Sequence, residues 1–194
     1  MHVEVLSNVV LRMGILTYNN TDGVQINSVH LAKGEKLIKI PNFGRTIEII
    51  GDSLASGMYT TFEGLSSFGY NIGAGLGETE YSVTAYPGIC LFDKECWGNL
   101  RGQLYQWWHT SDTSWRATQL YGSEPEEWDF DKHEAADIVV ICIGTNDANA
   151  HNNVTSAGYV AQYTMFIEGI HAVWPDAQIV LVVSTTFITL VAEN

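Results

Sequence analysis

Two patterns of hydrophobic residues divide the chain, and the change between them falls near residue 45. Every second residue from Val9 to Ile15 is apolar, which is the period of a half-buried β-strand. Short apolar stretches at residues 24–26 and 37–40 indicate further strands. Residues 1–45 are therefore predicted to be all-β, and they are too few to close a β-sandwich by themselves.

From residue 46 onward the pattern becomes that of an α/β domain. Four short runs are rich in Ile and Val without alternation, which is typical of parallel strands buried on both faces. These runs lie at residues 47–50, 81–85, 138–143 and 179–183. Apolar residues recur at helical spacing from Tyr159 to Trp174, and Pro175 marks the end of that helix. We expect one α/β domain over residues 46–194, with helices covering both faces of its sheet.

The composition is typical of a packed domain, and the net charge disfavours some classes of binding partner. Hydrophobic residues make up 46% and charged residues 16% of the 194 residues. The formal net charge is −13, so phosphate backbones and anionic membrane surfaces are repelled. No apolar run approaches the roughly 18 residues of a membrane span, and no signal peptide is visible. A neutral ligand such as an acylated sugar fits this balance, and we expect neither nucleic-acid nor membrane binding.

Three predicted strands end in residues that could carry acyl transfer. Ser53 follows the strand at residues 47–50 and opens a helix, which suits a nucleophile beside free backbone N–H groups. Gly88 follows the second strand, where the missing side chain lets its N–H approach a reacting carbonyl. Asn146 follows the third strand, and its side-chain amide can donate a third hydrogen bond to an oxyanion.

Each of these residues also has an ordinary structural interpretation. Ser53 or Asp52 can cap a helix, Gly88 can close a turn, and Asn146 can form an Asx turn. Because parallel strands end at the same edge of a sheet, the three residues are nonetheless expected to converge. The convergence favours a serine esterase that needs no metal or organic cofactor.

Two stretches carry a resemblance to a known superfamily. The run IEIIGDSLASG resembles the first block of the SGNH (GDSL-type) hydrolases, and IVVICIGTND resembles the third. Gly88 matches the glycine of the second block best, with Gly73 in YNIGAG as the alternative. The resemblance implies a flavodoxin-like, three-layer α/β/α fold with Ser53, Gly88 and Asn146 as the catalytic residues.

Within this superfamily the chain is most similar to carbohydrate esterase family 2. That likeness implies a secreted, monomeric enzyme that removes acetyl groups from oligo- or polysaccharides, with residues 1–45 as the last strands of a preceding β-sandwich. The insertion at residues 90–135 holds five tryptophans, whose faces could pack on sugar rings, although most are expected to be core or loop anchors. Trp97, Asp52 and Asp147 are assigned to the substrate-binding region, the two aspartates chiefly ordering their loops.

Cysteine and asparagine positions bear on the compartment. Cys90 and Cys96 lie six residues apart in a polar loop and are predicted to form a disulfide, which implies an extracellular location. Two unpaired cytosolic thiols are the alternative, and a zinc site lacks a second ligand pair. Cys142 lies in an apolar run and is expected to be buried. Sequons at Asn19 and Asn153 favour a secreted glycoprotein.

The resemblance also implies a general base that this chain does not supply. In the superfamily a histidine follows the fifth strand in a D-x-x-H motif, and none of the six histidines lies in such a motif. We therefore expect a domain that lacks its final strand and helix and is nearly inactive, since losing the histidine costs on the order of 10⁶ in kcat in serine proteases.

The sequence leaves three other interpretations. A non-catalytic truncated product or carbohydrate-binding pseudo-enzyme is the main alternative. An α/β-hydrolase, suggested by Gly51-x-Ser53-x-Ala55, would leave Asn146 without a role. A nucleotide-binding domain is disfavoured because the chain has no glycine-rich phosphate loop.

Overall fold

The computed structural model describes residues 32, 34, 43–110, 118–119 and 122–183. The strands predicted before residue 43, together with Trp115, lie outside the described residues. The assignment of residues 1–45 to a β-sandwich therefore stays a prediction.

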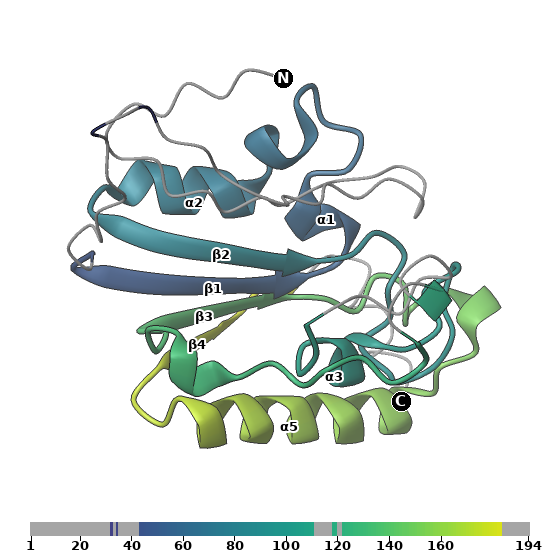
Figure 1. The fold of residues 1–194 in the computed structure, drawn as a ribbon. Helices are drawn as coiled ribbons and strands as arrows, with labels where there is room; N and C mark the ends of the chain where they lie inside the picture. The colour runs from purple at the N-terminus through teal and green to yellow at the C-terminus, as the bar shows by residue number, and fades with distance from the viewer. Residues whose placement is uncertain (1–31, 33, 35–42, 111–117, 120–121, 184–194) are drawn as a thin grey trace.

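The described part is built on a parallel sheet of four strands (Figure 1). In chain order the strands are β1 (Arg45–Gly51), β2 (Thr79–Ala85), β3 (Ile138–Cys142) and β4 (Gln178–Leu181). Their order across the sheet is β2-β1-β3-β4. All four strands predicted from the apolar runs are confirmed, and each pairs in parallel with its neighbour.

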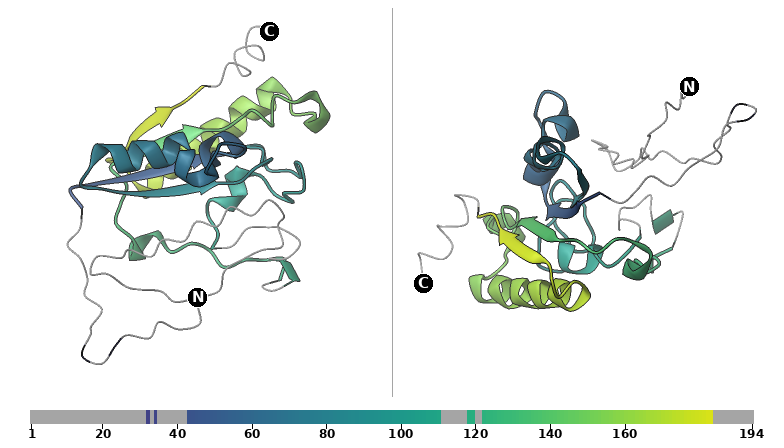
Figure 2. Two further views of the ribbon diagram at one scale, coloured as in Figure 1. Left: turned by 90° about the horizontal axis from the view of Figure 1, so that it is seen from above. Right: turned by 90° about the vertical axis from the view of Figure 1, so that its left-hand side faces the viewer.

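Helices cover both faces of this sheet, which confirms the three-layer α/β/α prediction (Figures 1 and 2). One face carries α1 (Ser53–Ser56) and α2 (Phe68–Leu76). The other carries α3 (Gln103–Gln106) and α5 (Ser156–Val173), and α5 is the helix that the periodicity predicted. Three short 3₁₀ helices complete the described elements: η1 (Glu63–Ser66), η2 (Phe130–Lys132) and η3 (Ala150–Asn152).

The central strand β1 is buried from both sides. Ile47 and Ile49 belong to the cluster that includes Phe68 of α2, whereas Ile50 packs in the cluster that contains Trp107 and α5. The continuous Ile/Val pattern thus marks a strand with two covered faces. Hydrophobic packing on both sides holds β1 in place, so the residues that follow it are also held in a defined position.

The outer strands differ from the prediction of full burial. Val180 and Leu181 of β4 are 44% and 45% exposed, and Val83 of β2 is 39% exposed. The reason is topological, because β2 and β4 are the two edges of the described sheet. An apolar run alone does not distinguish a central strand from an edge strand.

Helix α2 was not predicted because its sequence is rich in glycine, a poor helix former. The glycines let the helix lie close to the sheet. A Cβ built on Gly73 would lie 2.2 Å from the ring of Tyr81, and one on Gly69 would lie 3.3 Å from Ile49. Gly73 is therefore buried under β2 and has a packing role, which leaves Gly88 as the glycine at the strand ends.

Within the described ranges, no helix is long and apolar enough to cross a membrane. The same residues contain no group of three or more His, Cys, Asp or Glu side chains that could hold a metal ion.

Candidate active site

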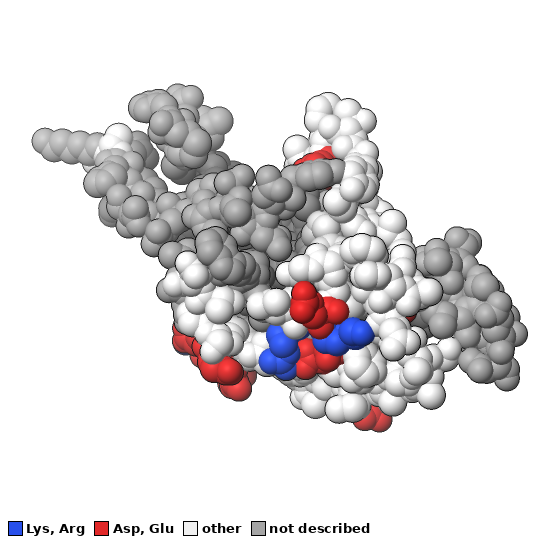
Figure 3. All heavy atoms as spheres, turned by 90° about the vertical axis from the view of Figure 1, so that its right-hand side faces the viewer, with Lys and Arg blue, Asp and Glu red and all other residues white. Residues whose placement is uncertain are grey.

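Three loops lie side by side where the strands of the sheet end. Gly51 of β1 is in register with Ala85 of β2 on one side and Cys142 of β3 on the other. Ser53, Gly88 and Asn146 follow these three positions within a few residues. The convergence expected from the sequence therefore follows from the pairing register. Figure 3 looks onto this edge, where charged atoms of both signs form one small group and most of the described surface is uncharged.

The first loop is a tight strand-to-helix turn around Ser53. Gly51 is required at this point, because a Cβ there would lie 2.5 Å from both the Cβ of Ala55 and the carbonyl oxygen of Cys142. Asp52 caps α1, and its Oδ1 accepts a hydrogen bond of 2.9 Å from the backbone N–H of Leu54. Ser53 is the first residue of α1, and its Oγ forms no hydrogen bond with any described residue.

The second loop holds Gly88 in a conformation that favours glycine. Its φ is +82°, and a Cβ on this residue would lie 2.8 Å from the Cβ of Trp97. Cys90 and Cys96 form a disulfide, which confirms the predicted pairing and holds Trp97 next to Gly88. In the described part of the chain, the backbone N–H of Gly88 donates to no acceptor.

The third loop is tied to the second by side-chain hydrogen bonds. The Nδ2 of Asn146 donates to the carbonyl oxygen of Ile89 at 2.8 Å, which fixes the orientation of the amide. The carboxylate of Asp147 accepts from the N–H groups of Leu91 at 2.8 Å and Phe92 at 2.9 Å. The loop that carries Gly88 is thus held in place by the two residues that follow Thr145.

Three hydrogen-bond donors remain without described partners at this edge. They are the backbone N–H groups of Ser53 and Gly88 and the second Nδ2 hydrogen of Asn146. Ser53, Gly88 and Asn146 are all partly exposed, so a ligand oxygen could reach these donors. The arrangement suits the oxyanion of acyl transfer.

Asp52 and Asp147 lie beneath this surface and do not face it. Asp52 is fully buried and Asp147 is 2% exposed, which suits the predicted loop-ordering role, and their assignment to the substrate-binding region stays a prediction. The pKa of Asp52 is raised to about 6, chiefly by burial and in smaller part by the negative charge of Asp147, while the hydrogen bond from the Leu54 N–H opposes the rise. Burial also raises the pKa of Asp147, which its backbone donors partly offset.

Trp97 is the predicted substrate-binding residue that does reach the surface. Its side chain is 54% exposed, and its ring stacks on that of His151 with centroids 4.9 Å apart and planes at 27°. His151 is one of the six histidines that lie outside any D-x-x-H motif. Its stacking role could not be predicted, because the two residues are 54 positions apart and meet only through the loop contacts.

The other described histidines lie in other settings. The Nδ1 of His109 is 2.8 Å from the carbonyl oxygen of Tyr105, and its ring stacks on that residue. His133 stacks on Trp128, with ring centroids 4.4 Å apart, and His171 is exposed on α5. None of these side chains is hydrogen-bonded to Ser53. The free thiol of Cys142 is buried as predicted, and that burial raises its pKa to about 11.

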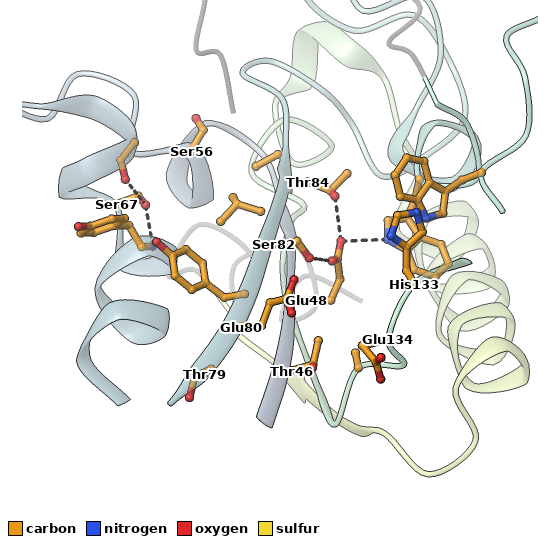
Figure 4. Close-up of a pocket in the computed structure, with 18 of the residues that line it drawn as sticks. Thr46, Glu48, Ser56, Ser67, Thr79, Glu80, Ser82, Thr84, His133 and Glu134 are labelled. Carbon is orange, nitrogen blue, oxygen red and sulfur yellow. Dashed lines mark hydrogen bonds between the residues drawn. The ribbon is translucent and has the colours of Figure 1, made fainter. Parts of the chain in front are cut away.

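A cavity of about 1080 Å³ lies over β2 and β1 and does not include the three loop residues (Figure 4). On its floor Glu48 of β1 accepts hydrogen bonds from Ser82, from Thr84 at 2.8 Å and from the Nε1 of Trp107 at 3.3 Å. The carboxylate joins the edge strand and the insertion to the central strand. We interpret this cluster as structural, because its polar groups form hydrogen bonds with one another.

Comparison with protein families gives a match over most of the α/β domain. The model of the GDSL-like lipase/acylhydrolase family matches residues 49–193, which include Ser53, Gly88 and Asn146. The chain belongs to this family. The GDSL-like family assignment removes the α/β-hydrolase interpretation of the Gly51-x-Ser53-x-Ala55 run. No curated protein matches the chain significantly.

Solved structures share the fold of this GDSL-like chain at low identity. A family two carbohydrate esterase from Clostridium thermocellum, in complex with cellohexaose, has a TM-score of 0.56 at 22% identity over 84% of this chain and 52% of its own. The acetyl xylan esterase Est2A from Butyrivibrio proteoclasticus has a TM-score of 0.55 at 16% identity over 80% of this chain and 53% of its own. The chain thus spans about half the length of these structures.

Proposed function

We propose that the chain carries the nucleophile and oxyanion donors of a serine esterase that hydrolyses acyl esters of carbohydrates, with acetyl as the acyl group. The observation that carries the proposal is the set of three donors without described partners on the loops of Ser53, Gly88 and Asn146, which follow neighbouring strands at one edge of the sheet. Membership in the GDSL-like lipase/acylhydrolase family supports the same reaction class.

The proposed reaction is acyl transfer through an acyl-enzyme. Ser53 Oγ attacks the ester carbonyl carbon, and the resulting oxyanion accepts hydrogen bonds from the N–H groups of Ser53 and Gly88 and from Nδ2 of Asn146. The serine proton passes to a base and then to the departing sugar oxygen. Water next attacks the acyl carbon, Ser53 regains its proton and the carboxylic acid is released.

The general base of this reaction is proposed to lie outside the described residues. Among the described histidines, His109, His133 and His151 have their rings stacked on Tyr105, Trp128 and Trp97. Ser53 Oγ has no described hydrogen-bond partner that could remove its proton. A base is needed because a serine hydroxyl is a weak nucleophile at neutral pH.

A carbohydrate ester is favoured over a charged ester by the surface around the site. The edge seen in Figure 3 is largely uncharged, and Trp97 exposes an aromatic face beside Gly88. The structures of similar fold come from a family two carbohydrate esterase with cellohexaose and an acetyl xylan esterase. A neutral sugar ring can pack on an indole face without the free-energy cost of removing water from a charged group.

A secreted, monomeric glycoprotein is part of the same proposal. The Cys90–Cys96 disulfide is typical of oxidising compartments, and Asn153 of the second sequon is exposed before α5. Secretion from a eukaryotic host should yield a glycan at Asn153 that peptide-N-glycosidase removes and that Asn153→Gln abolishes. Unmodified Asn153 in the secreted protein would contradict this part.

Ester turnover tests the proposal. Acetate release from acetylated xylohexaose and p-nitrophenol release from p-nitrophenyl acetate should both vanish in Ser53→Ala, while Ser123→Ala, which changes an exposed serine, should match the wild type. We expect turnover to be slow, because no described residue is hydrogen-bonded to Ser53 Oγ as a general base and a serine hydroxyl is a weak nucleophile at neutral pH.

A carbohydrate-binding domain without turnover is the second candidate, and the lack of a described partner for Ser53 Oγ favours it. Binding of xylohexaose together with turnover that is equal in the wild type and Ser53→Ala would support this candidate over the esterase.

A further inference from the structure

Trp97 occupies a backbone position that bulky residues avoid. Cys96 and Asn99 pair through two backbone hydrogen bonds of 3.0 Å, so Trp97 and Gly98 form the tip of a two-residue turn. Both tip residues have positive φ, +49° for Trp97 and +85° for Gly98. Such turns normally take Asn-Gly, and a side chain of this size at the first position costs about 1–3 kcal/mol.

The strained turn is fixed to the loop that carries Gly88. The Cys90–Cys96 disulfide links Cys96, at the base of the turn, to Cys90 in the loop that carries Gly88. The Nδ2 of Asn99 donates to the carbonyl oxygens of Pro87 at 3.0 Å and Cys96 at 3.2 Å. The surrounding bonds therefore determine where the Trp97 backbone lies, but they leave its exposed side chain free to choose a rotamer.

His151 supplies the contact that fixes the indole. It belongs to η3, in the loop of Asn146, and its backbone N–H donates to Oδ1 of Asn149 at 3.0 Å. The two rings stack at 4.9 Å although both side chains are exposed. Lys94 adds a further contact between the loops by donating to the carbonyl oxygen of Asn152. The pair thus spans the second and third loops beside the candidate oxyanion donors.

We infer that His151 is a positioning residue for Trp97 and that the stacked pair binds the sugar ring of the ester's alcohol part. The inference rests on the proposed function for its ligand class. One face of the indole is covered by His151, so the remaining exposed surface can pack on the C–H groups of a pyranose ring. Ordering the indole in advance lowers the conformational entropy lost on binding.

Xylohexaose binding, followed by tryptophan fluorescence and calorimetry, tests the inference without requiring turnover. His151→Ala should weaken binding roughly two- to tenfold, the range expected for the loss of one aromatic contact. His151→Phe keeps a stacking ring and should restore affinity to within twofold of the wild type. Trp97→Ala should weaken binding more than either variant.

His133→Ala is the matched control, because His133 stacks on Trp128 in the same way but at the cavity of Figure 4. It should leave xylohexaose affinity unchanged. Any one of four results would overturn the inference. The first two are equal affinity in His151→Ala and the wild type, and failure of His151→Phe to restore binding. The others are an equal loss of affinity in His133→Ala and no xylohexaose binding by the wild type. If His151→Ala fails to fold by circular dichroism, the comparison of His151→Phe with Trp97→Ala decides it.

Activity on p-nitrophenyl acetate separates this inference from the proposed function. The small ester has no sugar, so any change in its KM in His151→Ala should be smaller than the change in the KM for acetylated xylohexaose. The KM for acetylated xylohexaose should rise two- to tenfold in His151→Ala with kcat unchanged. Absence of turnover in all proteins, with the binding differences intact, would refute the esterase and leave the positioning role of His151 standing.

Discussion

Two buried carboxylates four residues apart on and after β1 have opposite surroundings. Glu48 is 8% exposed and accepts hydrogen bonds from Ser82, Thr84 and Trp107. Asp52 is fully buried, yet only its Oδ1 accepts a standard hydrogen bond, and Oδ2 has no partner among the described residues. Both oxygens of Glu48 are hydrogen-bonded, whereas one of the two oxygens of Asp52 is not.

Along one strand, the fully hydrogen-bonded carboxylate belongs to a structural cluster, and the incompletely bonded one lies at the candidate active site. A buried carboxylate that is fully hydrogen-bonded stabilises its neighbours, whereas an incompletely bonded one costs stability. Unsatisfied groups gather at the carboxyl end of the sheet: Oδ2 of Asp52, the N–H groups of Ser53 and Gly88, and one hydrogen of Asn146. Such departures from polar satisfaction are expected at functional sites.

Removing the satisfied carboxylate should have the largest effect on stability. Glu48→Ala leaves the donors of Ser82, Thr84 and Trp107 without their shared acceptor in a buried setting. We expect a loss of about 4 kcal/mol in the free energy of unfolding, measured in urea. Glu168→Ala, on the exposed face of α5, is the control and should change it by less than about 0.5 kcal/mol. A loss in Glu48→Ala no larger than in the control would show that the cluster is not structural.

Neutralising the unsatisfied carboxylate should change how stability depends on pH. Because the pKa of Asp52 is raised from 3.8 to about 6, the folded protein binds this proton more tightly than the unfolded chain does. Stability is therefore lost as the pH rises from near 4 to above 6, and Asp52→Asn removes that loss. The unfolding free energy of the variant relative to wild type should rise by about 3 kcal/mol over this window. A difference that is constant with pH would contradict the raised pKa.

Asp147 is a third buried carboxylate, and each of its two oxygens accepts one hydrogen bond. In Asp147→Asn one of the N–H groups of Leu91 and Phe92 loses its acceptor, so we expect a loss of about 2 kcal/mol in unfolding free energy. The exposed Asp176→Asn is the matched control. Equal stability of the two variants would mean that Asp147 does not hold the Gly88 loop.

The smallest effect has the opposite sign. Trp97→Asn places a residue that tolerates positive φ at the turn tip and removes the stack on His151, so relief of strain outweighs a lost contact. We expect a gain of about 1 kcal/mol in unfolding free energy together with weaker xylohexaose binding. A variant that is less stable than the wild type would argue that Trp97 is a structural anchor.

Local sequence predicts most of the fold and the outline of the site. The strands, α5, the Cys90–Cys96 disulfide and the positions of Ser53 and Asn146 at strand ends follow from apolar runs and short motifs. These features depend on residues close in the chain or on the shared direction of parallel strands. The catalytic roles of Ser53, Gly88 and Asn146 remain predictions for the experiments above.

Features that depend on distant contacts were missed. Helix α2 is glycine-rich because it lies against Tyr81, a reason visible only when helix and sheet are together. The burial of Glu48 depends on Trp107, which is 59 residues away. The burial of Asp147 depends on its bonds to Leu91 and Phe92, so its distance from the substrate surface could not be inferred from its place in the GTND run.

The most direct test is the effect of Asn146→Ala on Ser53-dependent turnover of p-nitrophenyl acetate. Oxyanion stabilisation does not require the general base, so even slow turnover should respond to loss of this donor. We predict that kcat falls by about 10²–10³ while KM changes little, the size seen when one oxyanion donor is removed elsewhere. An Asn146→Ala protein that is folded and turns over as fast as the wild type would contradict the central claim.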